Sequence, residues 1–245
     1  GGQAGAYLAK LGIAAIVVEG MPKKGSLYKL FVGKDKCQLT PADELKGMGN
    51  YDTVERLKDE FGLNAGYVSI GQAGEWLLPG ASVAFTDREL RPTRHAGRGG
   101  MGAVMGSKGL KAIAIDPEGG EAAPIVNKEA FKEAAKRFAK ALMEHPVTSQ
   151  GLTNYGTDIL INIINEAGGL PTRNFSSGRF ESADKVGGES LNKITLERKG
   201  DPSHGCMAGC IIRCSGTYLD KDGQYLSKWP EYETVWALGP NCGID

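Results

Sequence analysis

The chain has 245 residues, of which 41% are hydrophobic, enough for one large core or two smaller ones. Its 29 basic residues balance 29 acidic ones, so no long-range field favours nucleic acid or an anionic membrane surface as a partner. The longest apolar run, from Leu11 to Val18, is well short of the roughly 20 residues of a membrane-spanning helix, and no signal peptide opens the chain, so we expect a cytoplasmic protein.

Short helix and strand patterns alternate through the first half of the chain. The Ile- and Val-rich stretch 13–19 has the composition of a buried strand, and the alternation in residues 26–32 before a Gly-Lys-Asp turn predicts a hairpin. In chain order, the predicted elements are a helix at 3–11, a strand at 13–19, a hairpin of 26–32 with 37–40, a helix capped by Asp52 or Thr53 that ends at Gly62, and strands at 66–70, 82–85 and 111–115.

A turn-rich linker, Pro117–Glu121, is the predicted boundary between two domains. Beyond it, Asn127 is a suitable N-cap for a helix with one apolar face, and a second helix at about residues 157–167 stops at a glycine pair. We therefore predict an α+β chain, with a partial β-sheet domain at residues 1–118 and the start of a mainly helical domain at residues 124–245.

A glycine-rich loop at residues 97–102 contains a literal G-x-G-x-x-G, which in a dinucleotide-binding fold lies between a strand and a helix. The segment before it, Arg88–Arg94, is charged and contains proline, and only eight residues separate Gly102 from the next predicted strand. We therefore expect neither element beside the loop and disfavour a nicotinamide cofactor. A Walker phosphate loop is also excluded, because Ser107-Lys108 has the reverse of the required order.

Two interpretations of the glycine-rich loop remain open. Consecutive glycines let several amide N–H groups converge on an oxyanion. Four basic side chains nearby would suit a phosphate-bearing ligand: Arg94, Arg98, Lys108 and Lys111. The alternative is a tight, conformationally demanding turn that binds nothing.

Three of the five cysteines lie within nine residues, with the spacing C-x3-C-x3-C at Cys206, Cys210 and Cys214. Thiolates this close usually share a metal. In a helix, a spacing of four would align them on one face and suit inert packing. The glycines at 205 and 209 favour instead a loop that wraps a metal centre.

The spacing also limits which metal the cysteines would hold. Zinc prefers C-x2-C pairs with a second pair of Cys or His, and His204 alone is a poor substitute. A [4Fe–4S] cluster needs four ligands, and Cys37 and Cys242 are the remaining cysteines of the chain. We expect an iron–sulfur cluster whose fourth ligand lies outside this chain.

The glycine-rich loop and the cysteine cluster, in their order along the chain and in their residues, resemble the motifs of one family. Residues 96–113, AGRGGMGAVMGSKGLKAI, look like the tungstopterin-binding loop of the tungsten-dependent aldehyde:ferredoxin oxidoreductases. Further segments resemble motifs of the same family: Gly71–Glu75, Gly169–Phe175, the cysteine cluster, Pro230–Thr234 and Leu238–Gly243. The resemblance covers essentially the whole chain. Because the chain starts without methionine and ends after a turn that leads onward, we expect an internal piece of a longer protein.

The resemblance implies an architecture and a set of cofactors. In this family a first domain built from two β-sheets holds two pterins, which bind tungsten through dithiolenes, and helical second and third domains complete the site. This chain would contain the later part of the first domain and the start of the second. The fourth cluster cysteine and most of the aldehyde pocket would lie in the missing C-terminal part, so we expect the fragment alone to be inactive.

Carried onto this sequence, the resemblance assigns cofactor-binding residues. The pterin and its phosphates would be lined by Arg94, His95, Ala96, Gly97, Arg98, Gly99 and Gly100, with a backbone carbonyl of His95 or Ala96 reaching a magnesium ion between the phosphates. The three clustered cysteines would be metal ligands. Their first gap is one residue longer than the C-x2-C-x3-C of many family members, which leaves Cys206 less secure as a ligand.

The resemblance also implies catalytic residues. Glu231 or Glu233 resembles an acidic residue placed near the metal, where a carboxylate would accept a proton from water or an aldehyde hydrate. The alternative for each glutamate is a solvated loop acid.

The implied activity is oxidation of an aldehyde to a carboxylic acid with water at a tungsten-bis-pterin centre, with electrons passing through a [4Fe–4S] cluster to ferredoxin. Molybdenum in place of tungsten, and a homodimer or a larger complex, are compatible with the same resemblance. Two alternatives from other classes are a non-catalytic iron–sulfur electron-transfer module and a nicotinamide dehydrogenase built on the glycine-rich loop. Within the family, a subunit of a larger reductase complex is a further alternative.

Overall fold

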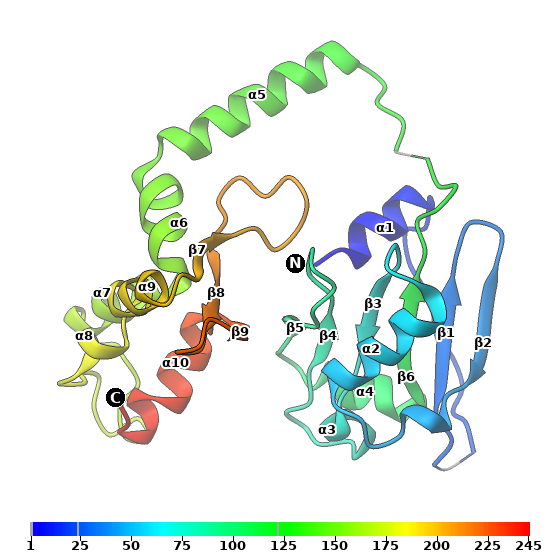
Figure 1. Cartoon of the computed structure of the whole chain (residues 1–245), viewed down its shortest axis with the longest axis horizontal. Helices are drawn as coiled ribbons and strands as arrows, with labels where there is room; N and C mark the ends of the chain where they lie inside the picture. Colours follow the sequence, from blue (N-terminus) through cyan, green and yellow to red (C-terminus); the bar gives the residue numbers. More distant parts are fainter. Residues whose placement is uncertain (1, 24, 122) are drawn as a thin grey trace. The chain divides into compact units, whose positions relative to one another are not determined.

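The structure is a computed structural model that describes residues 2–23, 25–121 and 123–245. It divides into two compact units, of which the first ends at Val126 and the second comprises Asn127–Asp245 (Figure 1). Both helices and strands occur in each, so the chain is α+β, as predicted. Among the described residues, every helix is too short or too polar to span a lipid bilayer.

A mixed six-stranded sheet forms the centre of the first unit, in the order β2-β1-β6-β3-β4-β5. Only β1 and β6 are parallel; the other neighbours are antiparallel. The strands are β1 (Tyr28–Val32), β2 (Cys37–Pro41), β3 (Gly66–Ser69), β4 (Val83–Phe85), β5 (Arg94–Ala96) and β6 (Leu110–Ile115). The helices are α1 (Ala4–Lys10), η1 (Asp43–Leu45), α2 (Asn50–Phe61), α3 (Gln72–Glu75) and α4 (Met101–Ser107).

Side-chain alternation along the sheet sets its two faces. Ala112 and Ala114 of β6 face α2, whose Val54 and Leu57 are buried against them and Tyr67. Ile113 and Ile115 of β6 point to the opposite face, where residues of α1 and Met105 of α4 pack. The sheet is therefore covered on both sides, and α2 lies across it in Figure 1.

Three sequence predictions in the first unit have clear outcomes. The predicted helix end is confirmed, since α2 ends at Phe61 and is followed by Gly62, which has φ +84°. The predicted N-cap, Asp52 or Thr53, was wrong: α2 begins at Asn50 after Gly49, and Thr53 is buried inside the helix. The strand predicted at Ile13–Glu19 is also wrong. Ile13 and Ile16 pack on the core, but the segment joins no sheet and Val17 is 79% exposed. Strand composition by itself does not make a strand, because strand preference depends on tertiary context.

The second unit contains helices and a small sheet. The helical segments are α5 (Lys128–Glu144), η2 (Val147–Gly151), α6 (Leu152–Tyr155), η3 (Gly156–Ile159), α7 (Leu160–Glu166), α8 (Ala183–Val186), α9 (Gly188–Glu197), α10 (Tyr232–Leu238) and η4 (Pro240–Cys242). The strands β7 (Asp201–His204), β8 (Ser215–Leu219) and β9 (Tyr225–Lys228) form an antiparallel sheet in that order, which the sequence patterns did not predict.

Packing in the second unit centres on two places. Ile161, Leu170 and Phe180 form a buried cluster beside Trp236 of α10. Trp229 is 2% exposed, and its indole nitrogen donates to Thr195 Oγ1 at 2.8 Å. The predicted N-cap of α5 is confirmed, because the side chain of Asn127 accepts a hydrogen bond from the amide of Ala130 at 3.0 Å. The predicted helix at 157–167 is divided into η3 and α7.

Candidate active site

The glycine-rich loop leaves the edge of the first sheet. Strand β5 pairs with β4, so that Arg94 lies opposite Phe85 and is buried. His95 is exposed, and its Nδ1 lies 2.9 Å from Ser82 Oγ. The chain then turns through Gly99 and Gly100, with φ of +76° and +65°, before α4 begins at Met101. Since L side chains rarely adopt this left-handed conformation, both glycines are needed by the turn itself.

Close packing explains three of the loop and helix glycines. A Cβ at Gly100 would lie 2.6 Å from the carbonyl oxygen of Pro79, and one at Gly102 would lie 2.4 Å from that of Ser82. A Cβ at Gly106 would lie 2.0 Å from the carbonyl oxygen of Gly74, where α4 crosses α3. The tight-turn interpretation therefore accounts for much of the glycine pattern without any ligand.

Gly97 and Arg98 are the part of the loop that packing does not explain. A Cβ at Gly97 would meet nothing within 4 Å, and both residues are exposed. The open space beside Gly97, next to the exposed and positively charged residue Arg98, fits an anionic group such as a phosphate. The residues present therefore fit the pterin phosphates that the resemblance implies.

The structure corrects the reasoning about the dinucleotide motif. A strand, β5, does run directly into Gly97, and a helix, α4, does follow the turn. However, β5 has three residues and pairs antiparallel at the sheet edge, and α4 has seven residues. The dinucleotide fold needs a parallel strand inside the sheet, so its topology still argues against a nicotinamide site.

Lys111 does not contribute to a phosphate site. Its side chain is fully buried, and its ammonium group contacts the carboxylate of Glu75 and donates to the carbonyl of Met48 at 2.8 Å. Burial lowers the pKa of Lys111, and the neighbouring Glu75 opposes that shift. Glu75 also accepts a hydrogen bond from the amide of Gly47 at 2.9 Å. This ion pair ties α3 to β6, so the Gly71–Glu75 motif has a structural role beneath the loop.

The three clustered cysteines lie on the loop between β7 and β8, which Figure 1 shows as an extended segment. No helix forms there, so the predicted loop is confirmed. Gly209 has φ +76° and Arg213 has φ +54°, and the amide of Arg213 donates to Cys210 Sγ at 3.4 Å. Turns with left-handed residues and amide-to-sulfur hydrogen bonds suit a thiolate-ligated cluster, so the donor chemistry fits.

The thiols also influence one another. All three are free and partly exposed. Burial raises the pKa of Cys214, and the charges of Glu231, Cys210 and Cys206 raise it further. Within residues 2–23, 25–121 and 123–245, however, no group of three or more Cys, His, Asp or Glu side chains is arranged to hold a metal ion. Their role as cluster ligands therefore stays a prediction.

Glu231 is the better positioned of the two candidate catalytic glutamates. It precedes α10, and its carboxylate accepts a hydrogen bond from Thr157 Oγ1 at 2.8 Å and contacts the ammonium group of Lys228. Thr157 in turn accepts from the amide of Tyr232 at 2.9 Å. Glu233 lies in the first turn of α10 and is exposed.

Asp158 is a member of this group that the sequence did not indicate. It follows Thr157 on η3 and is fully buried, and neither carboxyl oxygen has a hydrogen-bond partner. Burial raises the pKa of Asp158 to about 8, with Glu231 and Glu233 adding to the shift and Lys228 opposing it. An acid before an apolar run is an ordinary helix-start pattern, so no sequence signal distinguished it.

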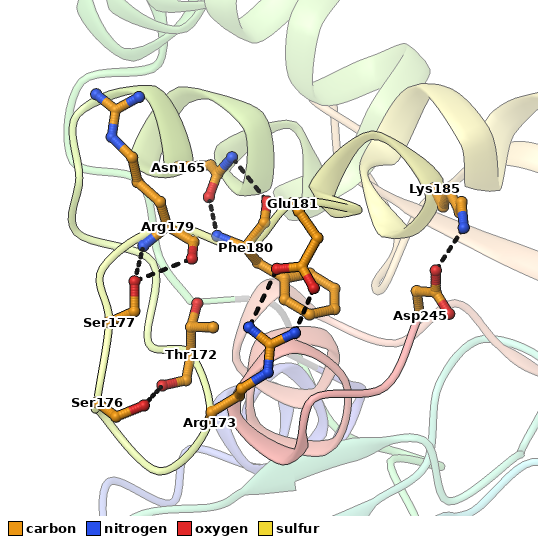
Figure 2. A network of polar contacts seen from close by, with 10 residues as sticks. All are labelled: Asn165, Thr172, Arg173, Ser176, Ser177, Arg179, Phe180, Glu181, Lys185 and Asp245. Carbon is orange, nitrogen blue, oxygen red and sulfur yellow. Dashed lines mark hydrogen bonds and ion pairs between the residues drawn. The ribbon is translucent and has the colours of Figure 1, made fainter.

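Two segments that resemble family motifs, Gly169–Phe175 and Leu238–Gly243, contact each other in the second unit. The amides of Arg173 and Asn174 donate to the carbonyls of Pro240 and Asn241 at 2.9 and 2.7 Å. Arg173, Asn174 and Phe175 all have φ between +44° and +61°, an unusual run for residues other than glycine. Figure 2 shows Nη1 and Nη2 of Arg173 donating to the two carboxylate oxygens of Glu181, which ties this loop to the segment before α8.

Comparisons with known proteins agree with this arrangement. A family model described as the aldehyde ferredoxin oxidoreductase N-terminal domain matches residues 1–117, and one described as domains 2 and 3 of the same enzyme matches residues 133–245. The chain is 40% identical over 246 residues to a tungsten-containing aldehyde ferredoxin oxidoreductase of Thermococcus kodakarensis, and 38% identical over 247 residues to that of Pyrococcus furiosus. All of this chain, and 38% of each relative, is covered.

More distant similarity extends to other reductases and oxidoreductases. The WOR-like subunit of an aliphatic sulfonate oxidoreductase from Pyrococcus furiosus is 26% identical over 253 residues, covering 98% of this chain and 38% of that protein. The active-site complex BamBC of benzoyl coenzyme A reductase, solved with 1,5-dienoyl-CoA, has a TM-score of 0.57 at 23% identity. That match covers 84% of this chain and 31% of the other, and it shows a shared fold.

Proposed function

The chain belongs to the aldehyde ferredoxin oxidoreductase family, and we propose that the protein containing it oxidises an aldehyde to a carboxylic acid, with water supplying the oxygen. The observation that carries the proposal is the 40% identity to a tungsten-containing relative over the whole chain, with both the glycine-rich loop and the cysteine loop inside the matched region. The chain spans 38% of that relative, so the remaining parts of the site would come from sequence outside it.

The glycine-rich loop is the proposed pterin-phosphate site. A tungsten ion held by two pterins, with molybdenum as the alternative metal, would supply the two-electron redox chemistry. Arg98 would offset phosphate charge, and the open space at Gly97 would admit the phosphate close to the backbone. Arg94 would support the loop from its buried position. The carbonyl of His95 or Ala96 would be a ligand of a magnesium ion that neutralises phosphate charge.

The cysteine loop is the proposed iron–sulfur site. Cys206, Cys210 and Cys214 would be three ligands of a [4Fe–4S] cluster, with a fourth from outside the chain, and the acceptor of its electrons would be ferredoxin. The amide of Arg213, which reaches Cys210 Sγ at 3.4 Å, is of the kind that stabilises a thiolate ligand and tunes a cluster potential. The support for an iron–sulfur site is the thiolate donor chemistry and the conformation of the cysteine loop.

Glu231 is the proposed proton acceptor for water or an aldehyde hydrate. Its hydrogen bond from Thr157 and its contact with Lys228 fix the carboxylate, while its side chain remains 39% exposed and able to meet a reactant. Glu233 is the second candidate. It lies two residues further on and is exposed, so it serves as a matched comparison.

The proposal is tested by aldehyde oxidation in the full-length protein purified without oxygen, with ferredoxin or a viologen dye as acceptor. Wild-type protein is expected to form the carboxylic acid and reduce the acceptor. Glu231→Gln is expected to lower kcat by about 10²-fold or more, the scale of a lost general base, whereas Glu233→Gln changes it little. Iron-dependent dye reduction without any carboxylic acid would instead support an electron-transfer module and overturn the catalytic proposal.

A further inference from the structure

Asp158 presents a problem that the proposed function does not explain. Its side chain is fully buried in η3, and both carboxyl oxygens lack a hydrogen-bond partner. A buried carboxylate without partners is strongly disfavoured, whereas a neutral carboxylic acid is far less costly to bury. The geometry therefore requires either that Asp158 holds a proton or that something compensates its charge.

The surroundings of Asp158 compensate a negative charge only in part. Lys228, the nearby cation, contacts the carboxylate of Glu231. Thr157 also gives its hydroxyl hydrogen to Glu231. The elements α6, α7, α9, α10 and β8 all lie against η3, but the charged groups of the described residues that act on Asp158 are Lys228, Glu231 and Glu233. Two of these three are acids, so the local field disfavours a second carboxylate.

We propose that Asp158 is a proton-holding partner of Glu231: its carboxyl group stays neutral inside the second unit, and it is a positioning residue that acts on the reaction by setting the charge beside Glu231. The arrangement divides two carboxyl groups into one neutral acid and one carboxylate. Glu231 carries the negative charge because Lys228 contacts its carboxylate and the Thr157 hydroxyl donates to it, while neither carboxyl oxygen of Asp158 has a hydrogen-bond partner. The effect on turnover rests on the proposed function, whereas the protonation of Asp158 does not.

Ionisation of Asp158 is expected to add a second negative charge to the group. Because burial raises the pKa of Asp158 to about 8, this occurs above neutral pH. The additional charge would compete with Glu231 for Lys228 and repel Glu231 itself, so the position of its carboxylate would change. The activity of the wild-type enzyme should therefore fall at alkaline pH with a midpoint near that of Asp158.

The first measurement is difference infrared spectroscopy of the full-length protein, with ¹³C-labelled aspartate as a check on assignment, between about pH 6 and about pH 9. A protonated aspartic acid that ionises with a midpoint near pH 8 is expected. The band should be absent from Asp158→Asn and present in Asp184→Asn, which changes an exposed aspartate of α8. A band that persists in Asp158→Asn, or its absence from wild type, would overturn the proposal.

A second variant tests the coupling while leaving Asp158 in place. Because the charge on Glu231 raises the proton affinity of Asp158, Glu231→Gln is expected to lower the Asp158 midpoint by more than about half a pH unit. Glu197→Gln, at an exposed position of α9, should leave it unchanged. An unchanged midpoint in Glu231→Gln would show that the two groups are not partners.

The last measurement links the pair to catalysis. The pH profile of kcat in wild type should show the alkaline fall, and Asp158→Asn, whose amide cannot ionise, should lack it. The same alkaline fall in both proteins would overturn the positioning role, even with the infrared band assigned to Asp158. If wild type oxidises no aldehyde at any pH, the proposed function fails instead, while the infrared and coupling measurements still decide whether Asp158 holds the proton.

Discussion

The crossing of α3 and α4 beneath the glycine-rich loop gives a sharp test of the packing account. Gly106 lies on α4, and a Cβ there would stand 2.0 Å from the carbonyl oxygen and 2.8 Å from the carbonyl carbon of Gly74. Both atoms belong to the backbone, so the helices would have to separate. Overpacking of this kind costs about 1–3 kcal/mol, against a gain of up to about 1 kcal/mol from replacing a helical glycine by alanine. We therefore expect Gly106→Ala to destabilise the first unit by about 1–2 kcal/mol.

Gly5→Ala is the matched control for Gly106→Ala. Gly5 lies in α1, and a Cβ there would meet nothing within 4 Å, so the same substitution should stabilise by roughly 0.5–1 kcal/mol. Urea unfolding followed by hydrogen exchange and mass spectrometry, read on peptides from residues 66–115, isolates the first unit. A Gly106→Ala protein as stable as wild type, beside a stabilised Gly5→Ala, would refute the close helix crossing.

Three further predictions concern charge, pH and metal binding. Lys111→Met leaves the 6% exposed Glu75 side chain without its cation, and urea unfolding should show a loss of about 3–5 kcal/mol that Lys111→Met with Glu75→Leu largely restores. Folded Asp158 keeps a proton that the unfolded chain releases above about pH 4, so stability should fall as pH rises from about 4 to about 8, by at most about 1.4 kcal/mol per pH unit. Thermal unfolding of Asp158→Asn should lack this contribution. The same pH dependence of stability in wild type and Asp158→Asn would contradict a buried, protonated Asp158. Elemental analysis should find less iron in Cys210→Ser and unchanged iron in Cys37→Ser, and unchanged iron in Cys210→Ser would place the cluster elsewhere.

Features that depend on local chemistry were predictable from the sequence. The end of α2 at Gly62, the Asn127 cap of α5 and the non-helical cysteine loop all follow from the conformational preferences of single residues. The resemblance of the glycine-rich loop to a family motif was also visible in the sequence, because the motif is contiguous and extends over residues 96–113.

Features that depend on tertiary partners were not predictable. The stretch 13–19 has strand composition but pairs with no strand of the sheet, so it remains irregular. The sheet of β7, β8 and β9 has short strands without clear alternation, and it is held partly by Trp229 packing on Gly216, where a Cβ would lie 2.4 Å from the indole. A local sequence pattern reveals neither the missing strand partner of residues 13–19 nor the packing of Trp229 on Gly216.

The site shows the same division. Lys111 has the charge expected of a phosphate ligand, but only the structure places it in a buried ion pair with Glu75. Asp158 reads as a helix-start acid, and its importance comes from full burial next to Glu231 and Lys228, which are distant in sequence. Chemistry carried by a contiguous motif can be read from sequence, whereas chemistry created by burial cannot.

The proposal that this chain carries part of a tungstopterin and iron–sulfur enzyme can be tested by the metal and pterin content of the full-length protein purified without oxygen. Elemental analysis for tungsten, molybdenum and iron, with fluorescence of the oxidised pterin, gives both contents from one preparation. We predict tungsten with about four irons and about two pterins per chain. Iron without tungsten, molybdenum or pterin would contradict the claim and leave an electron-transfer protein.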